Sequence, residues 1–199
     1  MNDIHVMSLG SNCMSLAVCG QGFGKDKKLN AKKDIRIPGP VDNLWTRGLE
    51  CAVSLITNDF IKMLKSEYKK VPRKKGWETD SDIEFEFPMF SIVHNNWEDQ
   101  KFQDSMYKRI EVFNEFKKNI NNPENYFIYS LGAFDVDSDG TPKESFRHAL
   151  NTLKELNVLD KIIFIGSRNV YNDTSIFNYY INESLVSNLG ISYVCIQDA

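Results

Sequence analysis

The chain has 199 residues and a formal net charge of −3. This length can bury the core of one domain. The small net charge gives no electrostatic reason to expect nucleic acid or a membrane surface as a partner. We expect a single domain over residues 1–199, with polar loop or elaborated segments at 21–38 and 65–82.

The sequence lacks the marks of exported and membrane-bound proteins. No charged N-terminal segment precedes a long apolar one, and no apolar run reaches the roughly 18 residues that a transmembrane helix needs. The four cysteines are scattered and show no zinc spacing. We therefore expect a cytoplasmic protein with free thiols, no metal and no cofactor. The cysteines are Cys13, Cys19, Cys51 and Cys195.

The first predicted strand is the apolar run 4–9, which Gly10 ends. Ser11 and Asn12 are good N-cap residues, so Cys13 falls in the first turn of the helix that follows. Unpaired N–H groups and the positive end of the helix dipole favour a thiolate there, and they would also hold an anion. On this stretch alone, an inert cysteine that packs as a small apolar residue is an equally open interpretation.

The next segment, 35–45, has two prolines around a glycine, which fix a rigid bend in place of regular structure. Asp42 lies in this bend. The bend can hold its side chain still, or Asp42 can simply cap the helix that the apolar spacing predicts from Leu44 to Ile56. Both interpretations stay open, and a second short helix is predicted after Asp59.

From residue 83 onward, predicted strands alternate with predicted helices. All strands except 83–87 are continuously apolar, which is typical of a parallel sheet covered on both faces. We predict an α/β fold with one mostly parallel open sheet of about five strands and helices on both faces. Strands 4–9, 89–93, 126–131 and 161–165 should be parallel neighbours. The predicted strands are 83–87, 89–93, 126–131, 161–165 and 191–196, and the helices are 100–119, 142–156 and 175–188.

Ligands of an open α/β sheet bind at the carboxyl ends of the strands. Cys13 and His94 are the cysteine and the histidine that follow predicted strands. At one edge of a sheet they could form a thiolate–imidazolium pair, in which a third group orients the histidine. We place Asp42 first in that role. A strand-end histidine that only binds water is the alternative for His94.

Backbone N–H groups of the turn before Cys13 would bind an oxyanion or another anion. The run 135–140 resembles the start of a calcium loop, but Phe146 stands where the bidentate acid is expected. We interpret this run as a turn with three solvated acids. The anion-binding candidates are Gly10, Ser11 and Asn12, and the candidates for supporting the site are Asn95, Asn96, Arg109, Asp135 and Arg168.

Four short motifs follow one another in the chain: SLGSNC at 8–13, GPVD at 39–42, His94 at a strand end and YKRIEVF at 107–113. Their order resembles a bacterial family of unknown function that is classed with papain-like cysteine peptidases. The resemblance spans most of 7–131. It implies Cys13 as nucleophile, with His94 and Asp42 as its partners. Val41 departs from the family's usual aromatic residue, and Arg109 stands where two arginines are common.

We therefore expect a cysteine-dependent hydrolase of the peptidase, amidase or acyl-transferase type. Its substrate would be a small molecule, a peptide or a glycan-type compound. The alternative is a non-catalytic module that binds a sugar phosphate, nucleotide or glycan precursor in the same crevice, with Arg168 on the phosphate and Cys13 in the packing. Neither hypothesis calls for nucleic acid or a membrane, and both leave the oligomeric state open.

Overall fold

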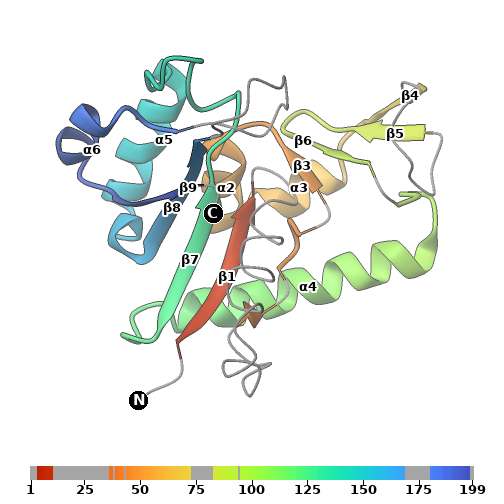
Figure 1. Ribbon diagram of the computed structural model, residues 1–199. Coiled ribbons are helices and arrows are strands. Elements are labelled where there is room, and N and C mark those ends of the chain that lie inside the picture. The colour runs from red at the N-terminus through yellow and green to blue at the C-terminus, as the bar shows by residue number, and fades with distance from the viewer. Residues whose placement is uncertain are drawn as a thin grey trace.

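The computed structural model describes residues 4–10, 36–37, 39–42, 44–72, 83–93, 95–168 and 180–197. Their strands form two sheets (Figure 1). The strands are β1 (His5–Gly10), β2 (Arg36–Ile37), β3 (Leu44–Thr46), β4 (Lys69–Pro72), β5 (Ile83–Glu86), β6 (Phe90–Ile92), β7 (Asn125–Ser130), β8 (Ile162–Arg168) and β9 (Ser192–Gln197). The helices are α2 (Leu49–Ile56), α3 (Phe60–Leu64), α4 (Gln100–Lys118), α5 (Glu144–Glu155) and α6 (Glu183–Leu189), with a 3₁₀ turn η1 (Leu159–Lys161).

The larger sheet is parallel and has the order β2-β1-β7-β8-β9. β7 lies between β1 and β8, with Met7 opposite Phe127 and Phe127 opposite Ile162. The predicted parallel pairing of 4–9, 126–131 and 161–165 is therefore confirmed. From β1 the chain goes first to β2 on one side and later to β7 on the other. This topological switch point, between the carboxyl ends of β1 and β7, is where open α/β sheets bind ligands.

The smaller sheet is antiparallel and has the order β3-β6-β5-β4. The prediction of one open sheet is wrong, and so is the placement of strand 89–93 beside β1. That strand, β6, pairs with β3 and β5 instead. A tight turn joins β5 to β6, in which the Phe87 N–H donates to the Phe90 carbonyl at 2.9 Å. Such a short connection can only produce an antiparallel pair.

Short strands also replace two segments that we predicted otherwise. β4 lies within the polar segment 65–82, and β3 takes up the start of the helix predicted from Leu44. The helix itself, α2, begins at Leu49, because Gly48 before it adopts φ +89°, outside the helical range. In the described part of the helix predicted over 175–188, α6 begins at Glu183.

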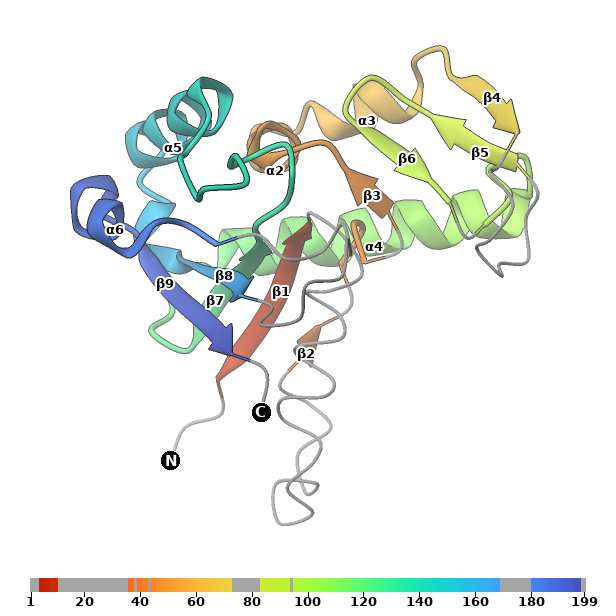
Figure 2. The same ribbon diagram turned by 45° about the horizontal axis from the view of Figure 1, so that its top comes forward.

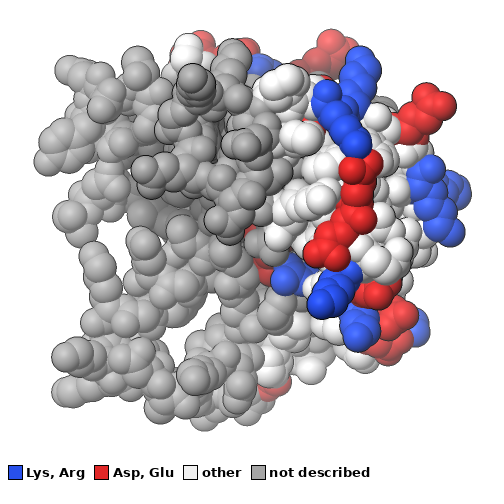
Figure 3. All heavy atoms as spheres, turned by 90° about the vertical axis from the view of Figure 1, so that its right-hand side faces the viewer, with Lys and Arg blue, Asp and Glu red and all other residues white. Residues whose placement is uncertain are grey.

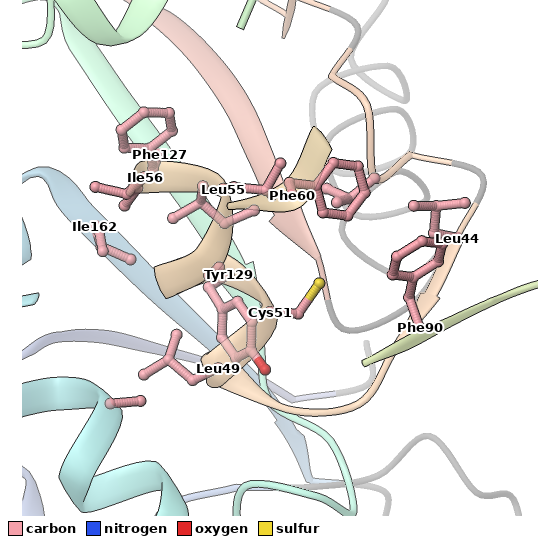
Figure 4. Packing of buried hydrophobic residues seen from close by; sticks show 14 of the residues in the cluster. Leu44, Leu49, Cys51, Leu55, Ile56, Phe60, Phe90, Phe127, Tyr129 and Ile162 are labelled. Carbon is pink, nitrogen blue, oxygen red and sulfur yellow. The ribbon is translucent and has the colours of Figure 1, made fainter. Parts of the chain in front are cut away.

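The main hydrophobic core joins both sheets through the helices on one face of the parallel sheet (Figure 4). Phe113 and Phe116 of α4 contact Phe127 of β7, with ring centroids 5.6 and 5.4 Å apart. Phe146 of α5 contacts Phe164 of β8 at 5.9 Å. Phe127 lies opposite Ile162, two residues before Phe164, so both rings project from the same face.

The opposite face of the parallel sheet carries a smaller apolar cluster of Val6, Ile128 and Ile165. No described helix contributes to this second cluster. The helices that the structure describes therefore cover one face, where helices on both faces were predicted. None of these described helices is both long and apolar enough to cross a bilayer.

The antiparallel sheet is aromatic inside and charged outside. Phe87 stacks on Phe90 at 4.6 Å, and Trp97 meets Phe87 edge-on at 5.5 Å. On the surface, Lys70 of β4 forms an ion pair with Glu98 at 2.6 Å. Figure 3 shows this side of the molecule, where cationic and anionic residues alternate over the described part. Positive and negative charges thus partly offset each other over these described residues.

Candidate functional site

The carboxyl end of β1 is packed against the segment that leads from β2 to β3 (Figure 2). Gly10 ends β1 with φ +116°, and a Cβ there would lie 2.7 Å from Thr46 Oγ1. A Cβ on Gly39 would lie 3.2 Å from the Ser8 carbonyl oxygen. Glycine therefore permits close backbone approach at both contacts. These two contacts fix the strand that leads to Cys13.

β1 is also irregular just before Gly10. Its register against β7 shifts between Ser8 and Gly10, so the strand bulges there. The Ser8 hydroxyl accepts the N–H of Gly10 at 3.2 Å within this bulge. Bulges next to functional sites redirect the following side chains. The irregularity thus lies at the end of β1, directly before the segment of the sequence that contains Cys13.

Asp42 is held at the end of the Gly-Pro-Val-Asp turn. Only 3% of its surface is exposed, and its Oδ2 accepts the Gly39 N–H at 2.8 Å. The bend predicted to hold Asp42 still is therefore present. The alternative role of Asp42 as N-cap of the next helix is wrong, because Gly48 occupies that position at the start of α2.

Asp135, predicted as a solvated acid, is buried, with 1% of its surface exposed. Its Oδ2 accepts the Gly132 N–H and its Oδ1 accepts the Leu49 N–H, each at 2.9 Å. The Tyr129 hydroxyl lies 2.9 Å from both oxygens and donates to them. The interpretation of 135–140 as three solvated acids is thus wrong for Asp135, and it holds for Asp137 and Asp139, which are exposed.

Burial raises the pKa of Asp135 from 3.8 to about 7, because the ionised form loses its hydration. The N–H groups of Gly132 and Leu49, the Tyr129 hydroxyl and the charge of Lys143 act in the opposite direction. Both carboxylate oxygens are engaged by β7, α2 and their own turn. This arrangement ties separate parts of the fold together.

The remaining residues predicted to support the site are less firmly held than Asp42 and Asp135. Asn96 Oδ1 accepts the Glu98 N–H at 2.9 Å and so stabilises its own turn, and Asn95 is half-buried. Arg109 is half-buried on α4, and no ion pair or hydrogen bond of its side chain is found in the described part of the chain. Ser11, Asn12, Cys13, His94 and the side chain of Arg168 lie outside the described residues.

Sequence reasoning missed three residues that shape this region. Thr46 packs on Gly10, Gly48 lets the loop after β7 approach α2, and Tyr129 binds Asp135. One signal was present in the sequence: a glycine followed by an aspartate three residues later occurs after both β2 and β7. In each case the aspartate accepts the N–H of that glycine.

Two cysteines, Cys51 and Cys195, lie in the described part of the chain. Cys51 lies among apolar side chains of α2 and the core (Figure 4), and burial raises the pKa of its thiol to about 12. Cys51 is therefore protonated and inert at neutral pH. Cys195, on β9, is half-buried. Within the residues that the structure places, no group of three histidine, cysteine or acidic side chains could hold a metal ion.

Comparison with known proteins gave no match to a protein-family model, a curated protein or a solved structure.

Proposed function

We propose that the chain is a cysteine-dependent hydrolase or acyl-transferase in which Cys13 is the nucleophile, His94 the general base and Asp42 the group that orients His94. Cys13 follows the carboxyl end of β1 by three residues. That end borders the topological switch point of the parallel sheet, the usual ligand site of such folds. The fixed backbone around Gly10 supports a site that must hold a nucleophile in place.

The register of β3 against β6 is the observation that carries the proposal. Leu44 lies opposite Ile92, and Thr46 lies opposite Phe90. Asp42 stands two residues before Leu44 in the sequence and His94 two residues after Ile92, so both belong to chain segments that adjoin this last pair of the sheet. A buried carboxylate beside the imidazole would select its tautomer and stabilise the imidazolium form. The turn that fixes Asp42 through Gly39 gives such a carboxylate a constant position.

The chemistry assigns one task to each group. The Cys13 thiolate attacks the carbonyl carbon of an ester or amide, and a sulfur–carbon bond forms. N–H groups of the 10–13 turn would stabilise the oxyanion. The leaving group departs with its bonding electrons and takes a proton from His94. Water then attacks the thioester and gives a proton to His94, which frees the acid product and restores Cys13.

The test is acylation with p-nitrophenyl acetate, followed by intact-mass measurement and peptide mapping. We expect an acetyl adduct at Cys13, loss of that adduct in Cys13→Ala, and slower acylation in His94→Ala and Asp42→Asn. Iodoacetamide should alkylate Cys13 with an apparent pKa below the usual ~8.5. Cys51 is the internal control and should stay unmodified. Unchanged hydrolysis in Cys13→Ala would refute the proposal.

The strand order also supports a second candidate, a non-catalytic module for a sugar phosphate, nucleotide or glycan precursor. When strands are counted from the N-terminus of the sheet, β2-β1-β7-β8-β9 is the 2-1-3-4-5 order of flavodoxin-like folds, which bind phosphorylated ligands at their switch point. Thermal melting with a panel of sugar nucleotides tests this candidate. A ligand at ~100 times its Kd should add about 2.7 kcal/mol of stability, also in Cys13→Ala.

A further inference from the structure

β9 forms one edge of the parallel sheet. It pairs with β8 along its whole length, from Ser192 opposite Ile163 to Gln197 opposite Arg168. No strand in the described part of the chain pairs with its other side. Figure 2 shows β9 and α6, both blue, at the margin of the molecule. An edge strand presents unpaired N–H and C=O groups, to which another strand can bind.

β9 lacks the features that usually protect the edge of a sheet. β4, at the edge of the antiparallel sheet, contains Lys69, Lys70 and Pro72. Such lysines and prolines discourage the addition of another strand. The segment 180–197, which includes α6 and β9, has a single charged residue, Glu183, whereas 26% of the whole chain is charged. A surface depleted of charge is typical of the centre of a protein interface.

The apolar side chains of this segment are only partly covered. α6 has no buried residue, and its Leu185, Val186 and Leu189 are half-buried against the main core. On the opposite face of the sheet, Val194 lies across from Ile165 and so adjoins the smaller apolar cluster, but 50% of its surface is exposed. Incompletely covered apolar surface therefore reaches this edge of the sheet on both faces.

We propose that β9 and α6 form an interface between two copies of this chain, in which the two β9 strands pair antiparallel about a twofold axis. A second copy fits because β9 has no charged residue, so pairing with itself brings no like charges together. A twofold axis perpendicular to the sheet joins the two five-stranded sheets and leaves each face on its own side. The interface then covers Val194 of both copies on one face and both α6 helices on the other.

Sedimentation velocity of the full chain over a range of concentrations tests this interface. We expect a dimer that dissociates on dilution. Val194→Lys places a cation on each paired strand and should raise the dissociation constant of the dimer by about a hundredfold or more, since like charges meet in the interface. Val112→Lys is the matched control, because Val112 lies on α4 and is similarly exposed, at 45%. It should leave the dissociation constant unchanged.

Opposite charges test the pairing of the two strands directly. Neither Val194→Lys nor Val194→Glu should dimerise alone, but an equimolar mixture of the two should associate, because opposite charges then lie on adjoining strands. A mixture that stays monomeric would contradict the proposed pairing. A wild-type chain that is monomeric up to about 100 μM, or a dimer that Val194→Lys does not weaken, would overturn the proposal.

Hydrogen exchange of the wild-type chain decides the matter if the variants do not fold. Amides of β9 should exchange more slowly in the dimer than in the diluted monomer, because the second strand accepts their hydrogen bonds. Amides of β4, at the edge of the other sheet, should exchange equally at both concentrations. Exchange from β9 that is the same in dimer and monomer would place the interface elsewhere and refute the proposal. None of these measurements depends on the chemistry proposed for Cys13.

Discussion

The turns 39–42 and 132–135 contain the same local hydrogen bond in different surroundings. In both, a glycine N–H is accepted by the Oδ2 of the aspartate three residues later, at 2.8 Å for Asp42 and 2.9 Å for Asp135. Both aspartates are buried, and both turns follow parallel strands. We call these the Asp42 turn and the Asp135 turn.

The two turns differ in what surrounds them. The Asp135 turn is hydrogen-bonded to the start of α2 and to Tyr129 of β7, and so it connects a helix to the parallel sheet. The Asp42 turn lies on β1, where a Cβ on Gly39 would meet the Met7 side chain and the Ser8 carbonyl oxygen. The same backbone geometry can thus fix a carboxylate for stability in one place and for the proposed chemistry in another. Four experiments test this difference between the two turns.

Replacing each aspartate by alanine should give the largest effect. Asp135→Ala leaves the N–H groups of Leu49 and Gly132 and the Tyr129 hydroxyl without their acceptor. Because each buried unpaired donor costs about 1–3 kcal/mol, we expect a loss of about 4–5 kcal/mol in the free energy of unfolding. Asp42→Ala should cost about 2 kcal/mol. Urea denaturation at constant m measures both, and equal losses would show that both turns serve stability alone.

The pH dependence of the free energy of unfolding should show the second-largest effect. The native pKa of Asp135 lies near 7, above its unfolded value, so the native state binds more protons between about pH 4 and pH 7. The contribution of the Asp135 carboxyl to the free energy of unfolding is fully present below about pH 4, and it is lost as the pH rises through about 7. The loss is as much as about 4 kcal/mol, since one pKa unit is about 1.4 kcal/mol.

Urea melts of wild type and Asp135→Asn over this pH range isolate that contribution. The stability difference between the two proteins should change by the amount given above, because the exposed carboxylates are common to both. A difference that is flat between pH 4 and pH 7 would show that the native carboxyl titrates near its unfolded value.

Substitution of the glycines tests the contacts of the two turns. Gly48→Ala should cost about 2 kcal/mol, because φ +89° strains a side chain and the new Cβ would lie 3.3 Å from Phe134. Gly39→Ala should cost about 1 kcal/mol, because its Cβ meets Met7, a flexible side chain, and the Ser8 carbonyl at 3.2 Å. Thermal or urea melts give both values, and the reverse order would contradict these contacts.

Tyr129→Phe should have the smallest effect. It removes one of the donors of Asp135 and leaves the two N–H groups in place. We expect a loss of about 1 kcal/mol in the free energy of unfolding, as for a typical buried hydrogen bond. A double-mutant cycle with Asp135→Asn checks it. Additive losses would indicate that the hydroxyl and the carboxyl do not interact.

The parallel sheet could be predicted because its strands and helices carry strong local patterns. The apolar runs of β1, β7 and β8 and the helical spacing of α4 and α5 were all found in the sequence. The antiparallel sheet was missed although a clue existed. Only Pro88 separates the predicted strands 83–87 and 89–93, and a parallel crossover needs a dozen residues or more. The sequence of β4 has no apolar pattern, so the strand could not be predicted locally. It forms because its backbone pairs with β5.

Part of the site could be predicted for the same reason. The prolines around Gly39 predicted a rigid bend at Asp42, and the structure contains this bend. The burial of Asp135 could not be predicted, because three acids in a short run are typical of a solvated turn. Only the tertiary placement of Tyr129 and α2 supplies its partners. The pairing of Cys13 with His94 stays a prediction.

The strand order has a consequence for the order of folding. β8 and β9 join the sheet through nearby partners, since Phe127 pairs with Ile162 and Ile163 pairs with Ser192. β1 must instead find β7 across a long loop, because Val6 pairs with Tyr126. Closing that loop carries a larger entropy cost, so β1 should dock after the β7–β8–β9 unit has formed. The strand that leads to Cys13 would thus take its place late, and a chain whose β1 has not docked would be largely structured yet would lack the proposed site.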